Sequence, residues 1–265
     1  MKNILVPIGN NNKTANTLQY AIDFAEKVDA KIYLIHVFTS SKVSGSFVNI
    51  DPILEKESKE ILEECLSKVN TKNVEIISST LKSHSIVDTL KQLIKLLKID
   101  LIITSTKNEG TDDTIFLGKI TGSIIKDTET PVLVIPAKAS FRPISKILMT
   151  IKSGSINSVT TLDLLEKIQK TFNTTIHLLQ VKTPKLKTEE LTLNKKLKEM
   201  IATLISTNNA TVFQGVLEFL QVENPDMVCV IRRKRGFFKK LWEEDKVKKI
   251  DFDSNVPVLV LKGLS

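Results

Sequence analysis

The order of apolar segments in the first half of this chain recurs in its second half. Three pairs of segments occupy matching places: Asn3–Ile8 and Lys146–Ile151, Lys31–Val37 and Thr175–Val181, and Pro131–Ile135 and Pro257–Leu261. A repeat that spans a whole unit of this length indicates a duplicated domain, not a solenoid of short repeats. The sequence therefore predicts two domains of one fold, over residues 1–138 and 144–265, with a short linker between them.

The spacing between the two copies changes along the chain. Thr175 follows Lys31 by 144 residues, whereas Pro257 follows Pro131 by 126 residues. The second copy is therefore shorter by about one long loop, most simply the loop after its second strand.

Within each copy, short apolar runs alternate with segments of helical pattern. Runs such as Leu101–Thr104 and Val132–Ile135 are β-branched and continuous, which is typical of strands buried on both faces of a parallel sheet. Between such runs, apolar residues recur with the period of a helix, and Asp51-Pro52 has the pattern of an N-cap followed by a first-turn proline. The alternation predicts an α/β fold, with a five-stranded parallel sheet between helices in each domain and right-handed crossovers.

The composition is that expected of a soluble globular protein, with 42% hydrophobic and 26% charged residues. No apolar run approaches the ~20 residues of a membrane helix, so we expect no membrane span. Cys65 and Cys229 both lie in apolar patterns, which predicts buried thiols and a reducing, cytoplasmic location. The net charge of +8 is spread over lysine-rich helix faces, so we do not expect a nucleic-acid partner.

Four short motifs, in this order, resemble the universal stress protein (UspA-like) family: ILVP at Ile4–Pro7, LIHV at Leu34–Val37, DLII at Asp100–Ile103 and TPVLVIP at Thr130–Pro136. Their weaker recurrence in the second half resembles the tandem-domain members of that family. The resemblance implies two Rossmann-like (HUP-type) domains and a role in the stress response.

The closing strands of this family commonly pair with their copy in a partner. The resemblance thus implies that Val132–Ile135 and Val258–Leu261 pair within the chain as an intrachain pseudo-dimer. Both strands are apolar, and such pairing would cover two sheet edges that are prone to aggregate. A homodimer and protein partners of unknown identity remain open.

Nucleotide-binding members of the family carry an aspartate after the first strand and a loop of the form G-x2-G-x9-G-[ST] after the fourth. Glycines let backbone N–H groups approach phosphates, and the hydroxyl donates to a phosphate oxygen. Counting back from Pro131 places this motif, as candidate cofactor-binding residues, at Ser105, Asn108, Gly118 and Lys119. One glycine of three is kept, and Lys119 replaces the hydroxyl with a charge that can meet a phosphate.

The remaining motif positions depart from the family pattern. Gly9 stands where the aspartate is expected in the first copy, and Lys152 stands there in the second. In the second copy, Glu244 and Asp245 occupy the last pair of the loop motif, where two carboxylates would repel phosphate oxygens. We therefore do not expect the second copy to bind ATP in the manner of the family, and ATP or AMP stays an open ligand of the first copy.

The basic run Arg232–Lys240 is interleaved with aromatic residues. Such a run can bind nucleic acid or an anionic membrane surface through charge and stacking. Its Phe and Trp residues also lie at helical spacing, which indicates packing against the sheet with the charges in water. We favour this second interpretation.

No residue pattern commits the chain to catalysis. No Walker loop or G-x-G-x-x-G motif follows a strand, no serine lies in a nucleophile elbow, and the three histidines, His36, His84 and His177, lack metal-ligand spacing. Together with the family resemblance, this predicts a non-enzymatic stress-response regulatory or binding module that acts through protein partners. We expect it to bind little or no nucleotide and to have no catalytic residues, metal or cofactor. The alternative is an ATP- or AMP-binding protein that uses only its first domain, with at most slow hydrolysis.

Overall fold

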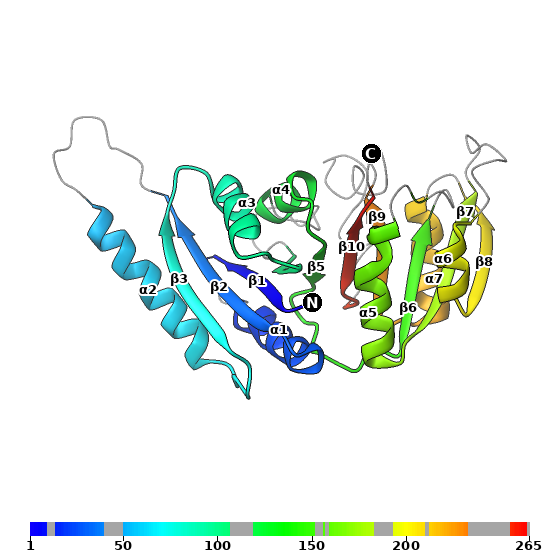
Figure 1. Cartoon of the computed structure of the whole chain (residues 1–265), viewed down its shortest axis with the longest axis horizontal. Coiled ribbons are helices and arrows are strands. Elements are labelled where there is room, and N and C mark those ends of the chain that lie inside the picture. Colours follow the sequence, from blue (N-terminus) through cyan, green and yellow to red (C-terminus); the bar gives the residue numbers. More distant parts are fainter. Residues whose placement is uncertain are drawn as a thin grey trace. The chain divides into compact units, whose positions relative to one another are not determined.

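The computed structural model describes residues 1–9, 14–39, 50–106, 119–151, 156, 159–182, 193–209, 212–232 and 255–263. These residues form two compact units, the first within residues 1–141 and the second within residues 142–263 (Figure 1). Each unit is a parallel sheet with helices packed on it, so the predicted α/β fold class is confirmed.

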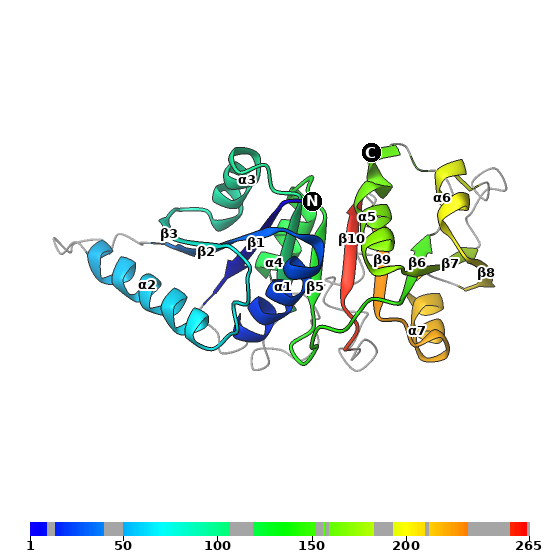
Figure 2. The ribbon, with the colours of Figure 1, turned by 60° about the horizontal axis from the view of Figure 1, so that its bottom comes forward.

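Unit 1 contains nine elements in strict strand–helix alternation. They are β1 (Asn3–Ile8), α1 (Thr14–Val28), β2 (Lys31–Phe38), α2 (Asp51–Ser67), β3 (Ile76–Lys82), α3 (Ile86–Leu96), β4 (Leu101–Ser105), α4 (Lys119–Asp127) and β5 (Val132–Ile135). The strands lie in the order β3-β2-β1-β4-β5, and each pair is parallel. Helices α1 and α2 contact each other on one face of the sheet, and α3 and α4 contact each other on the opposite face (Figure 2).

The central strands of unit 1 are apolar because both of their faces are covered. Ile4, Leu5 and Val6 are consecutive in β1 and all are fully buried, although their side chains alternate between the two faces. The same holds for Leu101–Ile103 in β4 and for Val132–Ile135 in β5. These continuous apolar runs were the sequence signal for strands, and they form the core of the unit.

Unit 2 repeats the arrangement. Its elements are β6 (Lys146–Ile151), the 3-10 helix η1 (Val159–Leu162), α5 (Asp163–Phe172), β7 (Thr175–Lys182), α6 (Lys195–Met200), β8 (Thr203–Asn208), α7 (Val212–Glu223), β9 (Met227–Arg232) and β10 (Val258–Lys262). The strand order β8-β7-β6-β9-β10 is that of unit 1, again with parallel neighbours. The duplication inferred from the sequence is therefore a duplication of topology.

The shortening of the second copy lies in the connection between its second and third strands, as the spacing predicts. Helix α2 has 17 residues and packs on β2 and β3, whereas its counterpart α6 has six residues. Unit 2 thus has a much shorter helix where unit 1 has a long one.

One local prediction was wrong in detail. Asp51 is not the N-cap of α2, because Ile50 occupies that position and no side chain caps the helix. The Asp51 carboxylate instead forms a close ion pair with Lys82 at the end of β3.

The cysteine and membrane predictions are consistent with the structure. Cys65 and Cys229 are buried free thiols, and burial raises the pKa of the Cys65 thiol to about 11. Among the described helices, none combines the length and the apolar character that a bilayer span requires.

Candidate functional site

The strand order of unit 1 singles out one edge of its sheet. From β1 the chain winds outward through β2 and β3 on one side, and then through β4 and β5 on the other. In doubly wound sheets, ligands bind beyond the carboxyl ends of the strands at the point where this order reverses. Leu5 lies opposite Ile102 in the parallel β1–β4 pair, so the ends of these two strands, at Ile8 and Ser105, fall at the same edge.

Threonine hydroxyls at the starts of two helices form hydrogen bonds with the strand ends at this edge. Thr14, the first residue of α1, donates to the backbone carbonyl of Gly9 at 3.3 Å. In the same way, Thr121 of α4 donates to the carbonyl of Ser105 at 3.0 Å, and its oxygen lies 3.3 Å from the Thr104 hydroxyl. The three threonines are buried, and each of these contacts is made within the protein.

The first turn of α1 contains a further hydroxyl. Thr17 is 3% exposed, and its Oγ1 atom has no hydrogen-bond partner. A buried hydroxyl without a partner is costly and needs an explanation, such as an absent ligand or water. The sequence pattern gave no sign of this atom, because Thr17 lies among the apolar residues of an ordinary helix face.

Gly9 directly follows β1, at the position of the family's aspartate. A Cβ atom built on Gly9 would meet no other atom within 4 Å, and its φ angle lies outside the left-handed region. Glycine is therefore not required here by the backbone, and the site has room for a side chain. The absence of a carboxylate at this position is therefore not imposed by the local backbone or by lack of space.

The predicted phosphate loop is described only at its two ends. Ser105 is the last residue of β4 and is half-buried, and Lys119 is the first residue of α4. Asn108, Gly118 and the side chain of Lys119 lie outside the described residues. The assignment of these four residues to a phosphate site thus stays a prediction.

The equivalent edge of unit 2 carries cations. Arg232 ends β9, and Lys262 lies opposite it at the end of β10. Burial lowers the pKa of Lys262, while Thr161 of η1 donates to the Lys262 carbonyl at 3.0 Å. The described part of the chain does not include Lys152, Glu244, Asp245 or the part of the basic run after Arg232.

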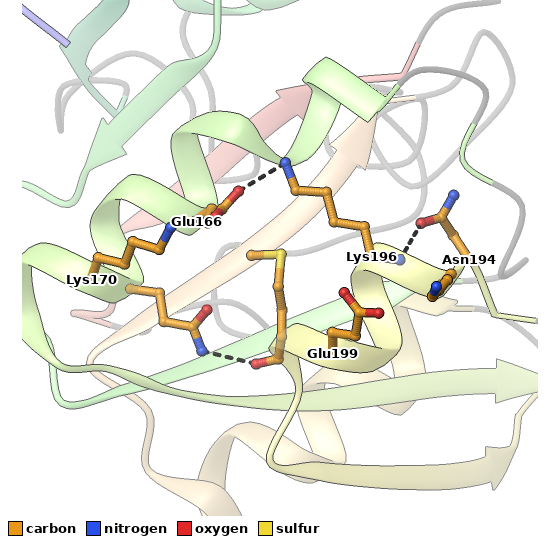
Figure 3. Close-up of a pocket in the computed structure, with 8 residues that line it drawn as sticks. Glu166, Lys170, Asn194, Lys196 and Glu199 are labelled. Atoms are coloured by element: carbon orange, nitrogen blue, oxygen red, sulfur yellow. Dashed lines mark hydrogen bonds and ion pairs between the residues drawn. The ribbon is translucent and has the colours of Figure 1, made fainter.

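A separate pocket of about 750 Å³ lies between α5 and α6 (Figure 3). It is lined by Glu166, Gln169, Lys170, Asn194, Lys195, Lys196, Glu199 and Met200. No sequence pattern predicts this pocket, because it depends on how a short helix packs beside α5.

Ion pairs between the lining residues neutralise much of the charge in this pocket. Glu166 Oε1 lies 2.6 Å from Lys170 Nζ, and Glu166 Oε2 lies 2.8 Å from Lys196 Nζ (Figure 3). The hydrogen bonds from Lys170 and Lys196 lower the pKa of Glu166 to about 2. Gln169 also donates to the Met200 carbonyl at 2.8 Å, so the pocket walls are bound to each other. No group of residues suited to hold a metal ion occurs in the described part of the chain.

The duplicated doubly wound sheet, with a candidate site at the reversal of its strand order, defines a tandem Rossmann-like protein. Residues 1–136 match the universal stress protein family. This match covers more than half of the chain, so the protein belongs to the universal stress protein family, as the sequence resemblance implied.

Known proteins are similar to this chain over one or both units. A curated universal stress protein of Methanocaldococcus jannaschii is 26% identical over 139 residues, which cover 51% of this chain and 81% of that protein. The crystal structure of a universal stress protein from Archaeoglobus fulgidus DSM 4304 matches with a TM-score of 0.73 and 18% identity, over 98% of both chains. A functionally unknown protein from Pseudomonas aeruginosa PAO1 matches with a TM-score of 0.57 and 14% identity, over 99% of this chain and 92% of that one. At these identities the two structures show a shared fold.

Proposed function

We propose that this universal stress protein is a non-enzymatic regulatory module of the stress response, which acts through protein partners and binds nucleotide weakly or not at all. The observation that carries the proposal is the chemistry at the reversal of the strand order in unit 1. Gly9 supplies no carboxylate after β1, although a side chain would fit there.

The hydroxyls at the same edge support this proposal. Thr14 and Thr121 donate to backbone carbonyls at the ends of β1 and β4, at 3.3 and 3.0 Å. A ligand that recruited either hydroxyl as a donor would have to break an existing bond, which offsets part of the binding free energy. Among the described residues of this edge, these two hydroxyls are therefore donors already bound within the protein.

We also propose a cytoplasmic location for this protein. Both cysteines are buried free thiols, and the described residues hold no disulfide. Unpaired thiols suit a compartment that keeps cysteines reduced.

Isothermal titration of the purified protein with ATP, ADP and AMP tests the proposal. We expect no heat of binding beyond dilution, and micromolar affinity for any of the three would overturn it. The Gly9→Asp variant, with Gly9→Asn as an uncharged control of the same shape, shows what the missing carboxylate contributes. We expect any gain in affinity only in Gly9→Asp.

A second candidate function is nucleotide binding by unit 1 alone, with at most slow hydrolysis. The buried hydroxyl of Thr17, which has no partner and lies in the first turn of the helix that follows β1, favours it. Ser105, Asn108, Gly118 and Lys119 would then contact the phosphates.

Substitution of one lysine distinguishes between the two candidate functions. If the second candidate is right, Lys119→Glu abolishes a measurable affinity, whereas Lys126→Glu at the far end of α4 retains it. Equal affinities of the two variants would remove the candidate.

A further inference from the structure

Strand β8 is an uncharged strand at the outer end of the unit 2 sheet. Among the described strands, β7 is its neighbour in the sheet. An end strand directs about half of its backbone N–H and C=O groups away from the sheet, where another strand can pair with them. The β8 sequence, Thr-Leu-Ile-Ser-Thr-Asn, has neither a charge nor a proline to discourage such pairing.

The absence of charge extends well beyond the strand itself. Residues 200–217 contain no Asp, Glu, Lys, Arg or His, in a chain of which 26% is charged. One side of the strand is also open, because Leu204 is 49% exposed and Ser206 is exposed. The opposite side faces the core, where Ile205 packs against Leu179 and its neighbours.

The equivalent end strand of unit 1 is protected. Strand β3 ends in Lys82, which pairs with Asp51, and it directly follows Glu75. The 17-residue helix α2 packs on it, whereas the helix before β8 has six residues. Charges and a covering helix are two of the devices that keep edge strands from pairing, and β8 has less of both.

We propose that β8 is an interface between two copies of this chain, in which the two β8 strands pair antiparallel about a two-fold axis. The net charge of +8 makes two copies repel each other. They can approach most closely through a segment that contributes no charge, and strand β8 is such a segment. Whatever the register, no like charges face each other across the pair, since residues 203–208 are all neutral.

A two-fold pairing of this kind ends at the dimer. Both partners contribute the same strand, so no free β8 edge is left once the pair has formed. Pairing of β8 with β3 of another copy would instead leave free ends and give open chains.

Sedimentation velocity over a range of concentrations tests the proposal. We expect the intact chain to be a dimer, the Ser206→Lys variant to be a monomer, and Ser78→Lys to remain a dimer. Ser78 and Ser206 are both exposed serines on end strands, so the second variant is a matched control. A monomeric intact chain, or equal effects of the two substitutions, would overturn the proposal. A monomer would indicate that a different partner covers β8, and equal effects would indicate pairing of β8 with β3.

Cross-linking keeps the proposal testable if Ser206→Lys does not fold. A short bismaleimide should link Ser206→Cys into dimers and leave Ser78→Cys unlinked, because Cys65 and Cys229 are buried. Added salt should also strengthen the dimer, since it screens the repulsion between two cationic chains. A dimer that weakens in salt would depend on ion pairs and contradict an uncharged interface.

Discussion

Asp226 Oδ2 accepts a hydrogen bond of 3.0 Å from the backbone N–H of Lys146. It also accepts bonds from the backbone N–H and the hydroxyl of Ser145, at 2.9 and 2.6 Å. In unit 1, Asp100 accepts bonds from the backbone N–H groups of Lys2 and Asn3, at 2.6 and 3.0 Å. Each copy thus uses the aspartate before its fourth strand to hold the start of its first strand.

Loss of either aspartate should destabilise its own unit. We expect Asp226→Ala to lower the free energy of unfolding by about 1–3 kcal/mol, because a charged acceptor of several hydrogen bonds is lost. Burial raises the pKa of Asp226, but the bonds from Ser145 and Lys146 outweigh it and the net shift is downward. Its contribution to stability is therefore present above the ordinary carboxyl pKa and is lost as the pH falls through the lowered value.

Urea unfolding of Asp226→Ala at pH 7 checks this expectation, and Asp226→Asn is the control for loss of charge alone. A free energy of unfolding equal to that of the unsubstituted chain would show that these bonds contribute nothing.

His36 should make the stability of unit 1 depend on pH. It is 4% exposed, its Nδ1 atom lies 2.6 Å from the Ser58 hydroxyl, and burial lowers its pKa. Between about pH 6.5 and the lower folded-state pKa, the unfolded chain binds a proton that the folded chain excludes. The free energy of unfolding should then fall with decreasing pH, by at most about 1.4 kcal/mol per pH unit.

The residue of unit 2 at the position of His36 is Gln180, which suggests a variant of His36 without the pH dependence. It is opposite Ile151 in unit 2, as His36 is opposite Ile8 in unit 1, and it is also buried. We expect His36→Gln to fold and to show a weaker loss of stability between pH 7 and pH 5, measured by urea unfolding. An unchanged pH profile would mean that His36 does not titrate in this range.

Lys196 should control the ionisation of Glu166. Hydrogen bonds from Lys170 and Lys196 hold the pKa of Glu166 at about 2, and Lys196 also lies 2.7 Å from Asp163. We expect Lys196→Met to raise the pKa of Glu166 in an NMR titration of the side-chain carboxyl carbon. Lys195→Met is the control, because Lys195 is its direct neighbour. The same pKa in both variants would contradict the geometry of the pair.

We expect alanine to destabilise the protein at Gly215 but not at Gly9. A Cβ atom on Gly215 in α7 would lie 2.9 Å from Val181 Cγ2 and 3.1 Å from Asn209 Oδ1, whereas one on Gly9 would meet nothing within 4 Å. We expect Gly215→Ala to lower the free energy of unfolding by about 1–3 kcal/mol through overpacking, despite the better helix propensity of alanine. Gly9→Ala should be neutral or slightly stabilising. Thermal unfolding of the two variants side by side decides this, and a stabilised Gly215→Ala would show that α7 shifts freely.

The sequence predicted the features that depend on local pattern and on repetition. The strands around Ile4–Val6 and Leu101–Ile103 were predictable because burial on both faces requires continuous apolar runs. The wrong N-cap at Asp51 has a physical reason, because an acidic residue also suits the first helical turn, and the partner Lys82 is close only in the folded sheet.

The candidate site was less predictable because its hydroxyls act across elements. Thr121 bonds to the carbonyl of Ser105 and Thr14 to that of Gly9, and nothing in their spacing distinguishes them from other threonines. The pocket beside Glu166 likewise exists only once α5 and α6 lie together. Contacts of this kind follow from the topology, not from the local sequence.

The strand order has a consequence for synthesis on the ribosome. Leu5 of β1 pairs with Ile102 of β4, so this side of the central strand can be paired only after 97 further residues have been synthesised. In unit 2, Leu148 pairs with Val228, and the corresponding number of residues is 80. Because closing a shorter span costs less chain entropy, we expect the second copy to complete its sheet with less delay during translation than the first.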